Sequence, residues 1–208
     1  MLQRALSALK PRRVVAVPDD VRIEGERVYL RPLGPQDVTG LFACASDPEV
    51  TRFLPWEPAK SVTTVRGFVQ DQTDRRRRGE SMAFAVVLSE SHDMIGSTDL
   101  MDLHSEPGRA ELGYLLRRAS WGQGLMTEAA TLTLGFAFET LGLHRVIAFA
   151  DAENLGSRRV LEKSGFRPWG SETRTVKSQK RLYIRYEVCR PEGDPAAAGT
   201  AIPVNTIP

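Results

Sequence analysis

Apolar and polar positions in this chain first alternate with a period of two and then repeat with the longer period of a helix. Residues 27–33 (RVYLRPL) alternate and predict a β-strand, and residues 36–46 follow with a helical pattern after a Gly-Pro break. Prolines on both sides of Trp56 predict an extended loop. A second helix is expected between Ser61, a favoured N-cap residue, and Gly79, a typical helix terminator.

The pattern then changes to a run of strands. Strand-like segments with short polar links occupy residues 81–89, 93–104 and 109–117, which predicts an antiparallel meander. Residues 125–142 are apolar on almost every side of a helix and are expected to be buried against a sheet. A buried strand, a short helix ended by Gly165 and a last alternating strand are expected at residues 145–150, 157–165 and 181–189. This order predicts an α/β fold with a mixed, mainly antiparallel sheet flanked by helices.

Composition divides the chain into three segments. Residues 1–20 form a basic N-terminal extension without the uninterrupted apolar run of a secretory signal. Residues 191–208 are rich in Pro, Ala and Gly and are expected to form a flexible tail. One folded domain is therefore expected over residues 21–190.

The overall composition narrows the classes of function. The 208 residues are 41% hydrophobic and 26% charged, as in an ordinary globular protein, and the net charge of +2 is too small to favour direct nucleic-acid binding or a membrane surface. No apolar run is long enough to cross a bilayer. Cys44 and Cys189 lie far apart in unlike contexts, so we expect neither a disulfide framework nor a metal site. A cytoplasmic location is expected as well, because its reducing conditions suit free cysteines.

A glycine-rich stretch, WGQGLMTEA at residues 121–129, precedes the apolar helix. Glycine allows positive φ and close approach to the main chain, and the free N–H groups at a helix start can bind an anion. A dinucleotide fingerprint would need a third glycine in place of Thr127 and a parallel strand before the loop, and a P-loop would need a Gly-Lys-Ser/Thr ending. A third interpretation is a loop that holds a pyrophosphate after a strand that splays from its neighbour.

Further motifs agree with the third interpretation. Segments RAELGYLLRRASWGQGLMTEA and FAFETLGLHRVIAFADAENLGSRRVLEKSGFRPWG resemble the GNAT acetyltransferase superfamily, in the branch that contains the ribosomal-protein N-terminal acetyltransferases of RimJ/RimL type. The strand, the Trp-Gly-x-Gly loop, the Asn-x-x-Ser helix start and the Glu-Lys-x-Gly-Phe ending follow in the order typical of that branch. The resemblance extends from about Arg27 to Tyr186 and implies the GNAT acyl-CoA N-acyltransferase fold, with acetyl-CoA as co-substrate.

The resemblance also implies which residues bind the coenzyme. Main-chain N–H groups of the loop, together with the Thr127 hydroxyl, are expected to hold the pyrophosphate, while the strand end binds the pantetheine arm like an added strand. Asn154 is expected to bind the same arm, although Asn is also an ordinary helix N-cap. The whole expected set is Leu115, Leu116, Trp121, Gly122, Gln123, Gly124, Leu125, Met126, Thr127, Asn154 and Ser157.

Three residues are candidates for catalysis. Glu111 is expected to remove a proton from the amine, directly or through water; the alternatives are a solvated strand glutamate and an ion-pair partner for an arginine. His104 is the reserve base, because its ordinary pKa suits the task. The tyrosine that protonates the leaving thiolate in other branches is replaced by Leu161, so Ser157 is the expected acid.

The resemblance places the acceptor beside the loop after residue 52. Phe53 and Trp56 are expected to bind the substrate amine, with His104 as a further candidate. The predicted reaction is direct attack of the amine on acetyl-CoA in a ternary complex, since no cysteine nucleophile is recognisable. The acceptor stays open between a protein N-terminus and a small-molecule amine, and a homodimer is one open alternative. A non-catalytic acyl-CoA sensor and a module that binds ATP or NAD are the rival functions.

Overall fold

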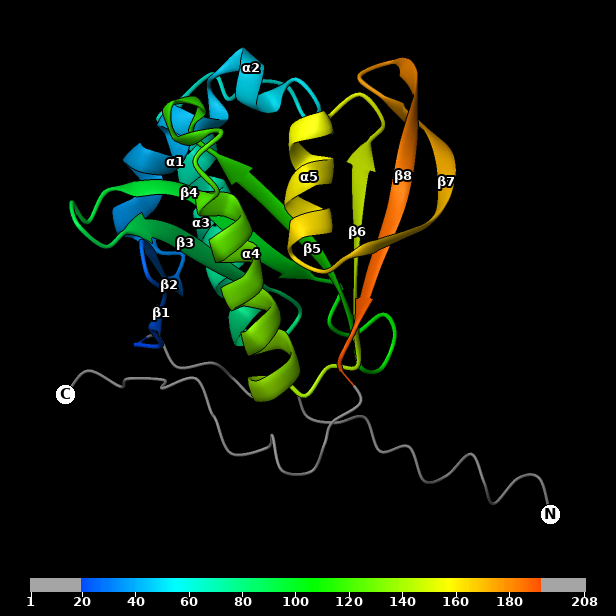
Figure 1. Ribbon diagram of the computed structural model, residues 1–208. Helices are drawn as coiled ribbons and strands as arrows, with labels where there is room; N and C mark the ends of the chain where they lie inside the picture. The colour runs from blue at the N-terminus through cyan, green and yellow to red at the C-terminus, as the bar shows by residue number, and fades with distance from the viewer. Residues whose placement is uncertain (1–19, 192–208) are drawn as a thin grey trace.

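Eight β-strands form one sheet in the computed structural model, which describes residues 20–191 of the chain (Figure 1). Their order across the sheet is β1-β2-β3-β4-β5-β6-β8-β7. The strands are β1 (Ile23–Glu24), β2 (Val28–Pro32), β3 (Met82–Leu88), β4 (Met94–Met101), β5 (Arg109–Leu116), β6 (Arg145–Asp151), β7 (Arg167–Val176) and β8 (Gln179–Cys189). The helices are α1 (Val38–Ala45), α2 (Pro48–Thr51), α3 (Val62–Arg77), α4 (Leu125–Gly135) and α5 (Leu155–Lys163). The extension expected at residues 1–20 and the tail expected at residues 191–208 lie outside the described residues, apart from residues 20 and 191.

Neighbouring strands are antiparallel except for β5 and β6, which run parallel. The β5–β6 pairing is short and extends only from Arg109 with Arg145 to Glu111 with Ile147. On its other edge β5 stays paired with β4 as far as Leu116. Beyond Glu111 the two parallel strands diverge (Figure 1), so among residues 20–191 no strand pairs with this edge of β5.

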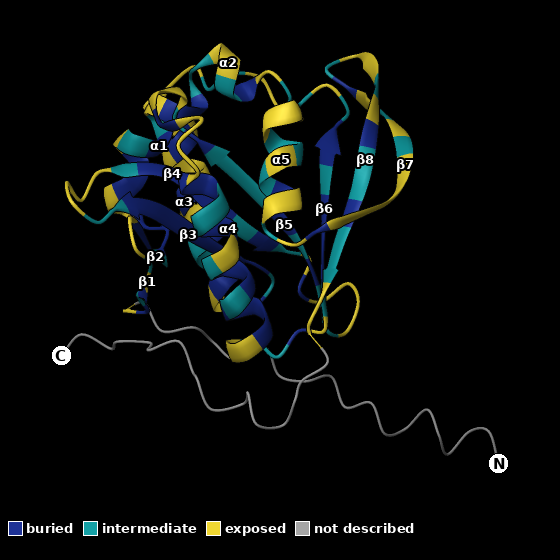
Figure 2. Cartoon of the chain, viewed as in Figure 1, coloured by how far each residue is buried: buried dark blue, intermediate teal, exposed yellow. Residues whose placement is uncertain are grey.

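Helices cover both faces of the sheet. α1 and α3 lie behind it in the view of Figure 1, and α4 and α5 lie in front. Because side chains alternate along a strand, Ala110, Leu112 and Leu116 of β5 join the core under α4, whereas Leu115 packs with the core under α1 and α3. The strands of the centre are largely buried and the outer sides of the helices are exposed (Figure 2). Glu111 shares the α3 face with Leu115.

The fold class predicted from the sequence, a mixed and mainly antiparallel α/β fold, is confirmed. Two strands were not predicted. β1 is only two residues long, and β7 contains Pro168 and Gly170, which break the alternation by which strands are recognised. β7 tolerates them because it is an edge strand, with a register shift between these two residues.

The helix expected over residues 125–142 is correct in position but divides into two parts. The α-helix α4 ends at Gly135, and a π-helical turn follows at Phe136–Thr140. The N–H of Leu141 reaches the carbonyl oxygen of Phe136, five residues back. Phe136 and Phe138 of this turn are both buried in the core.

Candidate active site

A cavity of about 1160 Å³ lies where β5 and β6 diverge. Its wall is formed by the end of β5, the glycine-rich loop, the start of α5, the loop after α2 and one side of α3. The structure brings most of the residues predicted from the sequence to this wall. They are Phe53, Trp56, Glu111, Leu115, Leu116, Trp121, Gly122, Gly124, Leu125, Met126, Thr127, Asn154 and Ser157.

Two predicted residues do not line the cavity. His104 is exposed, and its Nε2 lies 3.3 Å from the carbonyl oxygen of Arg78. Gln123 belongs to the loop, but its side chain donates to the carbonyl oxygen of Ala119 at 3.0 Å. The structure therefore gives His104 no place beside Glu111, and Gln123 contributes to the loop through its main chain.

The glycine-rich loop presents the open N-terminus of α4 to the cavity. Gly122 and Gly124 have φ values of 75° and 79°, in the left-handed region that glycine adopts without strain. Gly124 is the N-cap, and no side chain of the described residues caps the helix. The first-turn N–H groups at residues 125–127 have no acceptor within the helix, and the helix dipole adds positive potential there. This end of the cavity is built to bind an anion.

Arg27 and Glu128 tie the loop to the start of β2. The Arg27 Nη1 donates to the carbonyl oxygen of Gln123 at 2.8 Å, and its Nε donates to Glu128 at 3.1 Å. Glu128 also accepts from the backbone N–H groups of Arg27 and Val28, at 2.7 and 3.2 Å. Because Arg27 binds the Gln123 carbonyl oxygen, this oxygen points toward Arg27, and the hydrogen bond fixes the orientation of the peptide group. The sequence did not reveal this contact between Arg27 and Glu128, because the two residues are 101 positions apart.

The free edge of β5 offers main-chain groups to the cavity. The N–H of Arg117 donates to Ile95 of β4 at 2.7 Å, and backbone groups in an antiparallel pair face the partner at every second residue. Leu115 therefore also faces β4, while Tyr114 and Leu116 face the gap. The Leu116 carbonyl oxygen already accepts from Trp121 Nε1 at 2.8 Å. The main-chain groups of Leu115 therefore do not face the gap as expected, although the residue lines the cavity.

On the α5 side of the cavity, Tyr114 and Ser157 form a hydroxyl pair. Their oxygens lie 2.8 Å apart, and the tyrosine hydroxyl is also 3.0 Å from the Ser157 carbonyl oxygen. Burial raises the pKa of Tyr114 well above its ordinary value, so the phenol stays protonated. Asn154 is the N-cap of α5, and its Oδ1 accepts from the Ser157 N–H at 3.1 Å. Leu161 is buried in the core. Tyr114 is a candidate that sequence reasoning missed, although it closes the Glu-Leu-Gly-Tyr motif.

Glu111 lies at the point where the two strands separate. It is the last residue of β5 that pairs with β6. Burial raises the pKa of its carboxyl group, and Arg174 opposes that shift. No cation forms an ion pair with Glu111 in the described part of the chain, so the alternative of an ion pair with an arginine finds no support there.

A second carboxylate, Asp99 of β4, lines the same cavity and was not singled out from the sequence. Its Oδ1 is buried and has no hydrogen-bond partner among residues 20–191. Burial raises its pKa to about 7, with Arg75 opposing the shift. The only signal in the sequence was an aspartate inside an otherwise uncharged strand.

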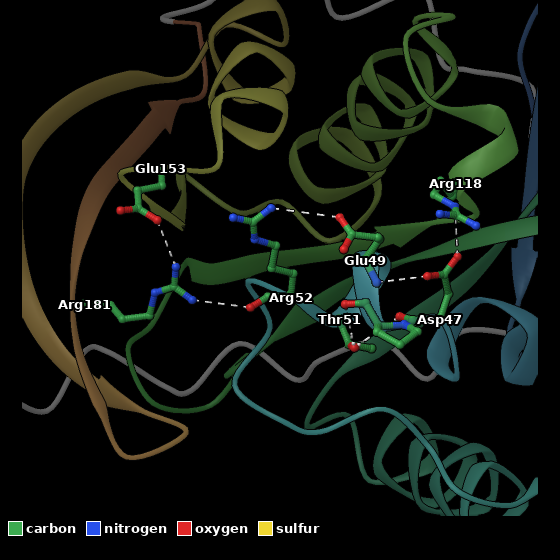
Figure 3. Close-up of polar contacts among 8 residues, drawn as sticks. Asp47, Glu49, Thr51, Arg52, Arg118, Glu153 and Arg181 are labelled. Carbon is green, nitrogen blue, oxygen red and sulfur yellow. Dashed lines mark hydrogen bonds and ion pairs between the residues drawn. The ribbon is translucent and has the colours of Figure 1, made fainter.

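The rim of the cavity near α2 is polar. Figure 3 shows ion pairs and hydrogen bonds that connect Arg118, Asp47, Glu49, Arg52, Arg181 and Glu153. The guanidinium groups of Arg52 and Arg181 each lie 5.1 Å from the centre of the Phe53 ring. Trp56 is 38% exposed. Aromatic and charged side chains thus meet at this entrance.

Two further searches cover residues 20–191. None of the helices there combines the length and hydrophobicity that crossing a membrane demands. Within the same residues, no three His, Cys, Asp or Glu side chains gather in a way that could hold a metal ion.

Comparison with known proteins identifies a family, related sequences and similar solved structures. Residues 27–167 match the family described as the acetyltransferase (GNAT) domain. The uncharacterized N-acetyltransferase p20 of Bacillus licheniformis is 32% identical over 161 residues, which cover 77% of this chain and 90% of that protein. The spermidine N(1)-acetyltransferase of Escherichia coli K12 is 25% identical over 143 residues, covering 67% and 72%. A structure of Mycobacterium smegmatis RimJ in complex with CoA-disulfide has a similar fold, with a TM-score of 0.71 at 24% identity, and covers 86% of this chain and 89% of RimJ.

Proposed function

Because this chain belongs to the GNAT acetyltransferase family, we propose that it transfers an acetyl group from acetyl-CoA to a primary amine by direct attack in a ternary complex. One observation carries the proposal: the uncapped N-terminus of α4 and the free edge of β5 open into the same cavity as Glu111. An anion site suits the pyrophosphate of the coenzyme, an unpaired strand edge suits its pantetheine arm, and a desolvated carboxylate suits proton removal from the amine.

The coenzyme is expected to lie across the divergence of β5 and β6. Its pyrophosphate binds the N–H groups of residues 122–127, and its pantetheine arm hydrogen-bonds to the gap-facing main chain of Tyr114 and Leu116. This arrangement brings the thioester near Glu111 and Ser157. RimJ is a protein of the same fold for which a coenzyme A derivative is part of a solved complex.

Glu111 takes a proton from the amine, whose nitrogen then attacks the thioester carbonyl carbon. The amide bond forms as the carbon–sulfur bond breaks, and the sulfur leaves as a thiolate. Ser157 donates a hydrogen bond or a proton to this thiolate, with its hydroxyl oriented by Tyr114. A gap-facing N–H of β5 near Glu111 is available to the carbonyl oxygen as negative charge develops there.

The acceptor is proposed to enter from the α3 side of the sheet, between Trp56 and Glu111. Spermidine is the acceptor named for the E. coli relative, and the RimJ/RimL resemblance favours a protein N-terminus. Both are primary amines, and a cytoplasmic location suits either. The open rim described above admits a peptide as well as a small molecule.

The proposal is tested by two measurements. Calorimetry with acetyl-CoA, ATP and NAD should show binding of acetyl-CoA alone, and a thiol-release assay should detect turnover with members of a panel of small amines and N-terminal peptides. No affinity for acetyl-CoA would overturn the proposal, and ATP or NAD binding in its place would identify a nucleotide module.

The sensor alternative makes a different prediction. A sensor would bind acetyl-CoA without turnover of any amine, and Glu111→Gln would then change nothing measurable. As an enzyme, the protein should lose transfer in Glu111→Gln while coenzyme affinity is kept. Glu139→Gln removes an exposed carboxylate outside the cavity and is the matched control.

A further inference from the structure

Six carboxylates lie along the cavity wall, and their partners divide them into two groups. Four form ion pairs: Glu49 with Arg52 at 4.0 Å, Glu57 with Lys177 at 3.9 Å, Asp151 with Arg181 at 2.7 Å, and Glu153 with Arg181 at 3.2 Å. Asp99 and Glu111 have no such partner in the part of the chain that the structure describes. The proposed function employs Glu111 and leaves Asp99 unexplained.

The strand register places these two carboxylates on one face of the sheet. Asp99 lies opposite Gly113, and Met101 lies opposite Glu111, so Asp99 and Glu111 are diagonal neighbours on β4 and β5. Diagonal neighbours in an antiparallel pair are about 7–8 Å apart. The face is the one covered by α3, whose Phe68 and Gln72 also line the cavity. Both carboxylates therefore lie on the proposed acceptor side.

Asp99 is held in surroundings that do not favour its charge. Its Oδ1 is shielded and unpartnered, and its cross-strand neighbours Ala83 and Gly113 have no polar side-chain groups. Arg75 of α3 is the charged group that lowers the pKa of Asp99, and Glu111 is its diagonal neighbour on β5. Since burial prevails and raises the pKa to about 7, the carboxyl is only partly ionised at neutral pH. A cationic ligand would supply the missing partner.

We propose that Asp99 binds a second positive charge of the acceptor, so that the preferred substrate is a primary amine with another ammonium group a few bonds away. Because Glu111 lies at the strand divergence and Asp99 one strand further from it, the nitrogen that reacts meets Glu111 and the second charge reaches Asp99. Hydrogen-bonded charge pairs of this kind favour the dication by about tenfold or more. The inference rests on the proposed function for the identity of the reacting nitrogen.

The test uses two ligands of equal length and different charge. Binding of 1,4-diaminobutane and of 1-aminobutane is measured by calorimetry on the full chain saturated with coenzyme A. The wild-type protein should bind the diamine about tenfold more tightly, and Asp99→Asn should bind both with similar affinity. The preference should also decrease below a pH of about 7, where Asp99 takes up a proton.

Controls keep the result specific. Asp71→Asn removes an exposed carboxylate of α3 that does not line the cavity and should keep the diamine preference. Coenzyme A affinity and circular dichroism show whether each variant is folded. Equal binding of the two ligands by the wild-type protein, or a preference that survives in Asp99→Asn, would overturn the inference. Because binding is measured without turnover, a failure of acetyl transfer would not imitate either result.

Discussion

The hydroxyl groups of Tyr114 on β5 and Ser157 on α5 lie 2.8 Å apart across the divergence of the sheet, although the residues are 43 positions apart in sequence. The contact joins the free edge of a strand to the first turn of a helix capped by Asn154. The pair thus supplies the cavity with a phenol and a neighbouring serine hydroxyl.

The Tyr114–Ser157 pair is tested by a double-mutant cycle. Tyr114→Phe and Ser157→Ala are each expected to lower kcat by about tenfold, less than a general acid usually contributes, because a thiolate leaves readily. If the hydroxyls act together, the double variant should be little slower than either single one. Ser171→Ala, on the exposed edge strand, is the control. Effects that multiply would mean that the two hydroxyls act independently.

The pH dependence of transfer should report Glu111. Since burial raises the pKa of this carboxyl, the base form is reached only at a pH above the ordinary range for glutamate. The kcat/KM for the amine should rise with pH through that pKa, and Glu111→Gln should remove this limb. Initial rates measured between pH 5 and 9, with an amine whose own titration is known, provide the check. An unchanged limb in Glu111→Gln would assign it to another group.

Gly124→Ala should weaken coenzyme binding by several-fold. The residue has φ +79°, and a left-handed conformation costs a side chain about 1 kcal/mol. Any relaxation would turn the N–H groups of the loop away from the pyrophosphate.

Gly67→Ala is the matched change within α3, where an added Cβ meets nothing within 4 Å, and should stabilise the protein by about 0.5–1 kcal/mol. Calorimetry with acetyl-CoA and thermal unfolding distinguish the two; unaltered affinity in Gly124→Ala would disprove the role of the loop conformation.

Arg27→Gln should weaken coenzyme binding without altering the KM for the amine. The side chain orients the Gln123 peptide from outside the cavity and acts only through the loop. Because Arg27 is about half exposed, the expected loss is modest, about threefold to tenfold in Kd. Arg22→Gln removes a similar arginine whose ion pair is local to Glu24 and should leave Kd unchanged. A rise in the amine KM would show that Arg27 acts elsewhere.

Asp99→Asn should make the protein more stable in alkaline solution. The folded pKa of about 7 lies above the ordinary value of 3.8, so the folded state binds more protons and its stability falls as pH rises between these values. The variant lacks this loss and should exceed the wild-type free energy of unfolding by about 1–3 kcal/mol at pH 8. Urea unfolding at pH 5 and pH 8 measures the free energy of unfolding of both proteins. If the variant exceeds the wild type by no more at pH 8 than at pH 5, Asp99 is not desolvated as described.

Local pattern was sufficient to predict most elements and the loop. The period of two and the helical period identified six strands and the long helices, because each face of these elements meets only one environment. Glycines before an apolar helix predicted an anion site, since free N–H groups are a local property of a helix start. β7 was not predicted because it contains Pro168 and Gly170, which are tolerated only at a sheet edge. Which strand lies at the edge is decided when the sheet assembles, and the sequence pattern does not reveal it.

The tertiary structure decided which side chains share the cavity. Tyr114 meets Ser157, Arg27 meets Glu128 and Asp99 stands beside Glu111 only because the sheet brings separate strands and helices together. Desolvation, which raises the pKa of both Asp99 and Glu111, likewise depends on what packs around them. His104 was a candidate base by residue type, yet it lies in the turn after β4, with its Nε2 3.3 Å from the carbonyl oxygen of Arg78, and does not line the cavity. Residue type and spacing determined the candidates, and the packing of distant segments determined which of them meet.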